Sequence, residues 1–202
     1  DFITPGKSDS LQATPLTLRY KKTSHNEGMA PYFRAYIQSE LLAWCREHEK
    51  EDGTPYNLFT DGLKIYTTID SRLQGYAEEA IKLQMTKLQE KFTRHADKRK
   101  LQEVAQTKLT RLPYYQQLRK EGLTEQEIMS ELKKPALRKI FTWKGEKEVE
   151  ISTIDSVLHH LQFLQAGFLA INPESGDVKA WVGGINHQFF QYDHVRESTK
   201  RQ

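Results

Sequence analysis

Apolar residues recur every three or four positions over two long stretches of the chain, which is the spacing of an amphipathic helix. The first stretch starts at Pro31, a residue that suits the first helical turn, and continues to about residue 48. The second follows Asp70, whose carboxylate can accept from the free N–H groups of a first turn, and continues to about residue 92. The apolar positions of these two predicted helices are Phe33, Ile37, Leu41 and Trp44, then Leu73, Ala77, Ala80, Ile81, Met85, Leu88 and Phe92.

Shorter helices are predicted further along the chain from their start and stop signals. Residues 113–122 begin with a proline and end with a glycine, and Thr124 with Glu127 forms a capping box for a helix to about residue 133. Ser152 and Asp155 offer a second cap, which opens a helix with apolar residues up to Leu164. Helical spacing also runs through residues 101–112.

Six short runs have the character of strands. Residues 16–20 alternate between apolar and polar, and residues 62–70 are rich in β-branched and aromatic side chains. Residues 138–143 and 148–152 flank a turn at Gly145, and residues 167–172 and 178–184 flank a run of turn formers, so both pairs predict hairpins. The fold class is therefore α+β, with long amphipathic helices packed on short antiparallel strands and hairpins.

Composition narrows the class of protein. Of the 202 residues 28% are charged and the net charge is +3, and the longest apolar runs are too short to cross a bilayer. Cys45 is the single cysteine, which excludes an internal disulfide and a cysteine-rich zinc site, and its helical setting predicts a small buried hydrophobic residue. The chain begins without Met and we expect it to be a piece of a longer protein.

One basic stretch allows two interpretations. Residues 82–108 carry eight Lys or Arg against three acidic residues, namely Lys82, Lys87, Lys91, Arg94, Lys98, Arg99, Lys100 and Lys108 against Glu90, Asp97 and Glu103. Because apolar residues alternate with these charges at helical spacing, a solvated outer face is the favoured interpretation. The alternative is a surface that binds an acidic partner, a phospholipid headgroup or nucleic acid.

Candidate chemistry is sparse. Ser130 and Lys133 have the Ser-x-x-Lys spacing in which a lysine can activate a serine, but nothing apolar nearby would lower the pKa of Lys133. The triplet 24–26 matches Ser-x-Asn, which is equally common by chance. The acidic pairs Glu47 with Glu49 and Glu78 with Glu79 indicate solubilising charges, and the adjacent His159 and His160 point about 100° apart on a helix. His187 and His194 lie in a loop-like tail, and we predict no catalytic, cofactor-binding or metal-binding residue.

Two stretches resemble the class A penicillin-binding proteins, which are bifunctional peptidoglycan synthases. The first stretch matches the segment of that family that leads into a Thr-Thr-x-Asp helix start, and the second resembles the opening hairpin of the transpeptidase domain. Asp61 stands where a second glycine is usual, and residues 192–195 differ from the commoner Phe-Asn-Arg-Ala. The matching residues are Pro31, Tyr32, Phe33, Glu40, Leu41, Gly62, Leu63, Thr67, Thr68, Asp70, Gln74, Ala77, Glu78 and Ala80, then Pro173, Gly176, Ala180, Val182, Gly183, Gly184, Arg201 and Gln202.

The resemblance implies where the chain lies in such a synthase. In the family a Pro-Gly-Ser run follows the Arg-Gln pair and carries the acylated serine, so a chain ending at Gln202 is expected to lack that serine and to be inactive. The glycosyltransferase signature is also not found. Residues 93–166 look like the linker of Bacteroidetes-type synthases of the 1A type. The implied division is a linker segment over 1–61, a linker region over 62–166 and the first transpeptidase hairpin over 167–202.

The implied function is that of a non-catalytic linker in a peptidoglycan synthase that polymerises glycan and cross-links peptides, and that β-lactams target. The parent would lie in the periplasm, anchored in the inner membrane by a segment outside this chain. Its partners would be the other domains of the synthase, with cell-wall regulatory proteins and peptidoglycan as further candidates, and not nucleic acid. The alternative hypothesis is a free-standing interaction module that binds an acidic partner through helices 82–108.

Overall fold

The computed structural model describes residues 3–12, 28–95 and 98–196, and these form seven helices and two antiparallel sheets of two strands each. This confirms the α+β class. The strand expected at 16–20, the triplet 24–26 and the Arg201–Gln202 pair lie outside the described residues. The helices are α1 (Pro5–Gln12), α2 (Pro31–Glu47), α3 (Ser71–His95), α4 (Lys98–Leu109), α5 (Pro113–Lys120), α6 (Glu125–Lys133) and α7 (Thr153–Leu161), and the strands are β1 (Pro135–Thr142), β2 (Gly145–Ser152), β3 (Phe168–Ile171) and β4 (Val178–Val182).

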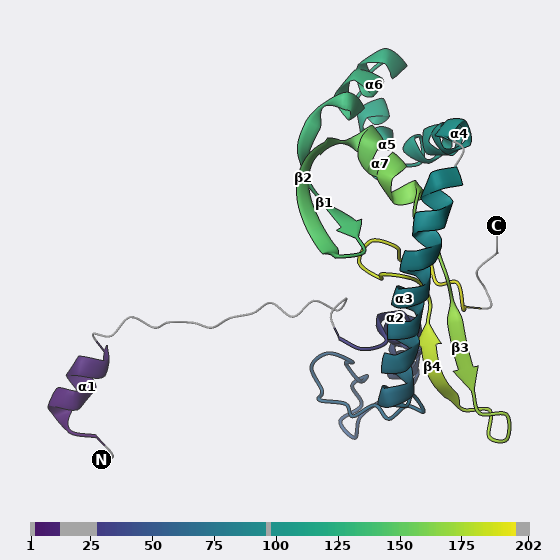
Figure 1. Cartoon of the computed structure of the whole chain (residues 1–202). Coiled ribbons are helices and arrows are strands. Elements are labelled where there is room, and N and C mark those ends of the chain that lie inside the picture. Colours follow the sequence, from purple (N-terminus) through teal and green to yellow (C-terminus); the bar gives the residue numbers. More distant parts are fainter. Residues whose placement is uncertain (1–2, 13–27, 96–97, 197–202) are drawn as a thin grey trace.

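Helix α3 runs along the molecule and joins its two packed regions (Figure 1). Its first half packs on β4 of the β3–β4 hairpin, and its far end approaches α4 and α7. The helix starts as predicted, because Asp70 Oδ1 accepts from the N–H groups of Arg72 at 2.9 Å and Leu73 at 3.1 Å.

The buried face of α3 differs from the apolar stripe that the sequence predicts. Leu73 is 46% exposed and Leu88 is 38% exposed, whereas Gln74 and Gln89 are buried beside Ala77 and Met85. The reason is that both glutamines form hydrogen bonds with main-chain groups of neighbouring segments. These bonds compensate for the loss of water around the buried amides.

The strand predicted at 62–70 is wrong. These residues run beside β4 with two hydrogen bonds, from Thr68 Oγ1 to the carbonyl of Val178 at 2.8 Å and from the N–H of Asp70 to the carbonyl of Lys179 at 3.0 Å. Their β-branched and aromatic side chains are not packed, since Ile65 is 45% exposed and Tyr66 is 89% exposed. Strand propensity mainly reflects packing on a half-buried surface, which this segment lacks.

The first packed region holds α4 to α7 and the β1–β2 hairpin. The capping box of Thr124 and Glu127 is present, and Ser152 Oγ accepts from the N–H of Asp155 at 3.0 Å, so both predicted helix starts are confirmed. The hairpin is also confirmed, with a two-residue loop at 143–144 and Gly145 as the first residue of β2. The buried core of this region consists of Leu109, Tyr115, Leu118, Ile128 and Leu132.

The second packed region is smaller and lies where α3 covers the β3–β4 hairpin. Its buried core consists of Ala77, Ala180 and Val182, with Ile81 and Ala170 partly buried against it. Helix α2 also packs on β4. Cys45 at the far end of α2 is buried and has a free thiol, as the sequence predicts. Within the described ranges no helix has the length and apolar character needed to cross a membrane.

Candidate functional site

The start of α2 packs directly on the Gly183–Gly184 pair that follows β4. Tyr32 is buried, and its hydroxyl donates to the carbonyl of Phe190 at 2.6 Å. A Cβ on Gly183 would lie 2.7 Å from Tyr32 Cδ1, and one on Gly184 would lie 2.8 Å from Tyr32 Cζ. Both positions therefore need glycine, because the Tyr32 ring lies against the backbone at each of them and the Asp193 carboxylate lies still closer to Gly183.

Gln74 of α3 binds the main chain of Trp181 in β4. Its Oε1 accepts from the N–H of Trp181 at 2.7 Å, and its Nε2 donates to the carbonyl of the same residue at 3.0 Å. Gln74 Nε2 also donates to Glu78 Oε1 at 2.8 Å, and that oxygen accepts from the N–H of Ala30 at 3.0 Å. Glu78 is half-buried, so its interpretation as a solubilising charge is wrong: it ties α3 to the residue before α2.

Trp181 then connects the hairpin to the segment that follows it. Its indole stacks on Tyr36 with the ring centroids 5.0 Å apart, and Nε1 donates to Asp193 Oδ2 at 2.9 Å. Asp193 Oδ1 accepts from the N–H of Val195 at 2.9 Å, and the N–H of His194 donates to the carbonyl of Gly183 at 2.8 Å. The two stretches that carry the family resemblance thus meet in one contact region.

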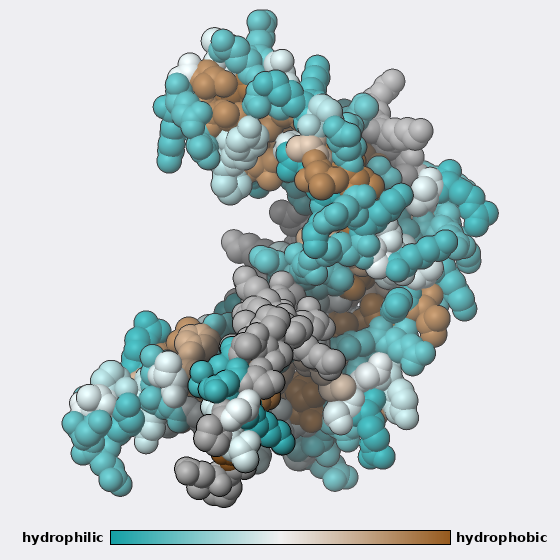
Figure 2. Space-filling model, turned by 90° about the vertical axis from the view of Figure 1, so that its left-hand side faces the viewer, coloured by the Kyte–Doolittle hydropathy of each residue, from teal (hydrophilic) through white to brown (hydrophobic). Residues whose placement is uncertain are grey.

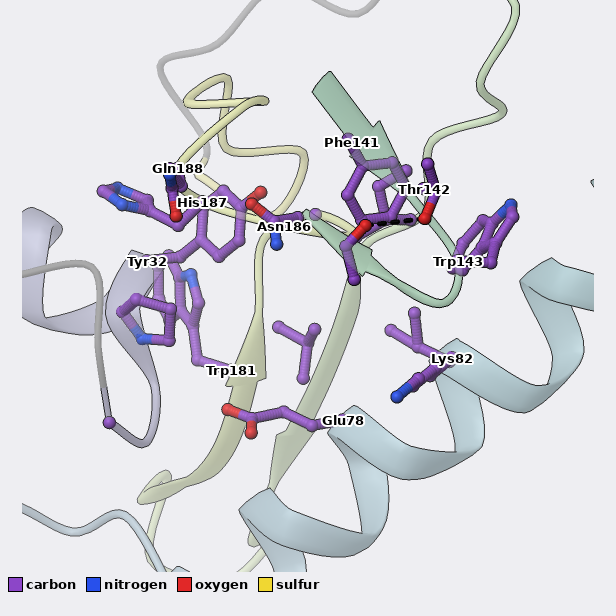
Figure 3. Close-up of a pocket in the computed structure, with 17 residues that line it drawn as sticks. Tyr32, Glu78, Lys82, Phe141, Thr142, Trp143, Trp181, Asn186, His187 and Gln188 are labelled. Atoms are coloured by element: carbon purple, nitrogen blue, oxygen red, sulfur yellow. Dashed lines mark hydrogen bonds between the residues drawn. The ribbon is translucent and has the colours of Figure 1, made fainter. Parts of the chain in front are cut away.

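A cavity of about 320 Å³ opens beside this contact region (Figure 3). Tyr32, Trp181 and His187 line it from α2 and the β4 end, Glu78 and Lys82 from α3, and the β1–β2 turn closes the opposite side. The face of the molecule seen in Figure 2 is mostly hydrophilic, with separate hydrophobic patches, and is hollowed between its upper and lower parts.

The electrostatics of this cavity keep the Tyr32 phenol neutral. Burial raises the pKa of Tyr32 well above its ordinary value, and the charge of Asp193 adds to this, so the phenol stays neutral and acts as a donor to Phe190. The ring of His187 lies edge-on to Tyr32 with the centroids 4.8 Å apart. The lining contains no serine or cysteine that could act as a nucleophile.

The structure separates the other candidates of the sequence from this region. Ser130 and Lys133 both lie exposed on α6, away from the Tyr32 cavity. Glu47, Glu49 and Glu79 are exposed, in keeping with solubilising charges.

The histidines and the basic stretch are placed as follows. His159 Nε2 lies 2.8 Å from the carbonyl of Phe141, and His160 Nδ1 lies 2.8 Å from that of Ser156. Over the described residues no three His, Cys, Asp or Glu side chains are grouped to hold a metal ion. The exposed members of the basic stretch are Lys82, Lys87, Lys91, Arg94, Lys100 and Lys108, and nothing is described of the other two side chains.

With this geometry in place, comparison with known proteins finds a family model that matches part of the chain. Residues 86–164 match the family model described as the penicillin-binding protein middle domain. This range begins inside α3 and includes α4 to α7 and the β1–β2 hairpin.

A curated relative is also similar to part of the chain. The chain is 36% identical over 81 residues to penicillin-binding protein 2D of Bacillus subtilis (strain 168), and the aligned part covers 40% of this chain and 11% of that protein. No solved structure matches the chain significantly. The family model and this relative together support the penicillin-binding protein family.

Sequence reasoning missed the two buried glutamines of α3, Gln74 in this contact region and Gln89 at the other end of the helix. Gln74 is part of the family resemblance, and that was the one signal available for it. Gln89 lies fifteen residues further along the helix, about 60° around its axis from Gln74, and no pattern in the sequence marks it as buried.

Proposed function

We propose that this chain is a non-catalytic linking region of a bifunctional, class A penicillin-binding protein of the 1A type, which acts in cell-wall assembly. Residues 1–61 and 62–166 would form the linker, and residues 167–202 would begin the transpeptidase domain. The parent protein would be a membrane-anchored synthase in the periplasm, and the direct partners of this region would be its other domains. The match over residues 86–164 and the relative from Bacillus subtilis support the family part of this proposal.

The observation that carries the linking role is the double attachment of α3. Near its start, Gln74 binds both main-chain groups of Trp181 in β4. Near its end, Gln89 Nε2 donates to the carbonyl of Gln162 at 2.7 Å, and its Oε1 accepts from the N–H of Leu164 at 2.9 Å. Helix α3 therefore fixes the β3–β4 hairpin and the first packed region relative to each other. A stiff connection between two catalytic domains requires such a fixed arrangement.

Covalent labelling by a fluorescent penicillin tests the non-catalytic part of the proposal. The purified chain is expected to stay unlabelled, because its Ser-x-x-Lys pair is exposed and lacks a buried lysine. A longer product of the same gene that includes the residues after Gln202 is expected to be labelled. Labelling of the present chain that disappears in Ser130→Ala would contradict the proposal.

A second candidate function is a binding module for an acidic partner, since six cations of the stretch 82–108 lie exposed on α3 and α4. Such binding would weaken steeply with salt, because cations that neutralise a polyanion release its counterions. Binding of heparin or of anionic phospholipid vesicles that persists at high salt, or survives charge neutralisation at Lys87, Lys91 and Arg94, would argue against this candidate.

A further inference from the structure

Strand β3 has main-chain groups on one side that pair with nothing else in the described part of the chain. It lies on the outer side of its hairpin, with β4 between it and α3 (Figure 1). Leu169 is opposite Trp181, whose N–H and carbonyl point away from β3 and bind Gln74. In such a pair the main-chain groups of both residues point outward, so those of Leu169 face away from β4. Those of Ile171 face the same way, because the next residue, Asn172, donates its N–H inward to Asp177.

The other hairpin protects its edges with charge, whereas β3 does not. Charged residues on an edge strand hinder pairing with a strand of another chain. Strand β3 consists of Phe, Leu, Ala and Ile and has no charged residue. The charged residues of β1 and β2 are Arg138, Lys139, Glu146, Lys147, Glu148 and Glu150.

Apolar side chains surround the open edge of β3. On the strand itself, Phe168 is 44% exposed, Leu169 is 39% exposed and Ile171 is 51% exposed. Beside it runs a groove of about 460 Å³ between α3 and the hairpin, and its lining is almost entirely apolar. Leu73 and Tyr76 line this groove from α3 and are 46% and 67% exposed.

We propose that β3 pairs with β3 of a second copy of this chain, antiparallel and around a two-fold axis at Ala170. This register places Leu169 of each copy opposite Ile171 of the other. Because the main-chain groups of both residues face outward, the two pairs form four hydrogen bonds. The product is a closed dimer with a four-stranded sheet in the order β4–β3–β3–β4.

The two α3 helices would lie on the same face of this sheet. Phe168 and Ala170 share the groove with α3, and each α3 packs on its own β4. The helices are then about three strand spacings apart, or about 14 Å. A helix with its side chains is about 10–12 Å across, so Leu73 and Tyr76 of the two copies can fill the space that remains. The apolar groove of one copy is thus covered by that of the other.

Charge at the two ends of β3 fits the same register. Glu174 is exposed on the turn that follows the strand. At the other end, a Cβ on Gly167 would lie 3.0 Å from Cβ of His194, and Arg196 follows two residues later and is exposed. Antiparallel pairing brings the turn of one copy beside the Gly167 end of the other. The acidic Glu174 of each copy therefore approaches the basic segment of its partner, once on each side of the axis.

The size of the apolar surface predicts the strength of the dimer. At about 200 Å² for a fully exposed large side chain, the five exposed apolar residues offer on the order of 500 Å² per copy. The dimer would bury about 1,000 Å² in all, which is at the lower limit for a specific interface. We therefore expect a weak dimer that forms with rising concentration and dissociates on dilution. This expectation does not depend on the proposed function.

Sedimentation velocity of the whole chain, from about 1 µM to about 1 mM, tests the dimer. The mass should rise from that of one chain to that of two. Leu169→Lys and Glu174→Lys should each raise the dissociation constant at least ten-fold, the first through a charge at the paired edge and the second through repulsion from Arg196. Leu137→Lys is the matched control, because it changes a 73% exposed leucine on the other hairpin and should leave association unchanged.

Amide hydrogen exchange locates the interface in the same samples. The amides of Leu169 and Ile171 should exchange more slowly as the concentration rises, and this change should be lost in Leu169→Lys. Unchanged protection of the Trp181 amide shows that the hairpin of each variant is folded. A single-chain mass over the whole range, growth beyond two copies, or a dimer that is equally strong in all three variants would overturn the proposal. A dimer without added protection at Leu169 and Ile171 would overturn it as well.

Discussion

Gln74 supplies both hydrogen bonds that a neighbouring strand would otherwise give to Trp181, with 2.7 Å between Gln74 Oε1 and the N–H nitrogen and 3.0 Å between Nε2 and the carbonyl oxygen. Both residues are buried, so water cannot replace the amide if it is lost. The pair joins residues 107 positions apart in the chain and fixes α3 on the β3–β4 hairpin.

Gln74→Leu should lower the free energy of unfolding by about 1–3 kcal/mol, because it leaves the buried N–H and carbonyl of Trp181 without partners. Urea denaturation followed by tryptophan fluorescence measures this loss. Gln102→Leu on the exposed face of α4 is the matched control and should change stability by less than about 0.5 kcal/mol. Equal stability of the two variants would show that the amide contributes nothing.

Gln89→Leu should act at the other end of α3. The N–H of Leu164 loses its acceptor, so its amide hydrogen should exchange faster with solvent, while the amide of Trp181 keeps its protection. Amide exchange measured residue by residue separates the two effects. Faster exchange at Trp181 but not at Leu164 would contradict the assignment of Gln89 to the 162–164 segment.

Gly184→Ala should destabilise the chain by about 1–3 kcal/mol, since its new methyl group would collide with the ring of Tyr32. The matched substitution is Gly75→Ala in α3, where a Cβ meets nothing within 4 Å and removal of a helical glycine should stabilise by about 0.5–1 kcal/mol. Thermal unfolding should therefore shift in opposite directions for the two variants. A shift of the same sign would argue against the close approach of Tyr32.

The cap on α3 should make stability fall in acid. Hydrogen bonds from the N–H groups of Leu73 and then Arg72 hold the pKa of Asp70 below its ordinary range. The unfolded chain thus binds the proton more readily, so the contribution of this carboxylate is complete above about pH 4 and is lost as the pH falls below it. Asp70→Asn keeps a capping side chain but has no charge to titrate. Between pH 5 and pH 2 this variant should therefore lose less stability than the unmodified chain, and the difference should correspond to the titration of one carboxyl group. An identical loss in both chains would contradict this role of Asp70.

The local parts of the fold could be predicted from the sequence because short-range chemistry determines them. The capping box of Thr124 and Glu127 and the hairpin around Gly145 need only neighbours within a few residues, and both are confirmed. Residues 62–70 show the limit of this reasoning. Their β-branched side chains match a strand, yet what decides their structure is the edge of β4, which lies more than a hundred residues away.

The contact region could be predicted less well than the fold. The resemblance to a known family pointed to Tyr32, Gln74, Glu78 and Gly183–Gly184, but not to the contacts that these residues make. Polar side chains such as Gln89 are expected on a solvated face, and only the position of the 162–164 main chain makes burial favourable.

The outer side of β4 is occupied by Thr68, Asp70 and Gln74, which use the main-chain groups of residues 178, 179 and 181. Any additional strand in a larger protein would therefore have to join alongside Phe168–Ile171, since that margin of the hairpin is the one left for pairing in the described part of the chain. Further strands can therefore be added to this sheet only beside β3, because α3 and the segment before it occupy the edge of β4.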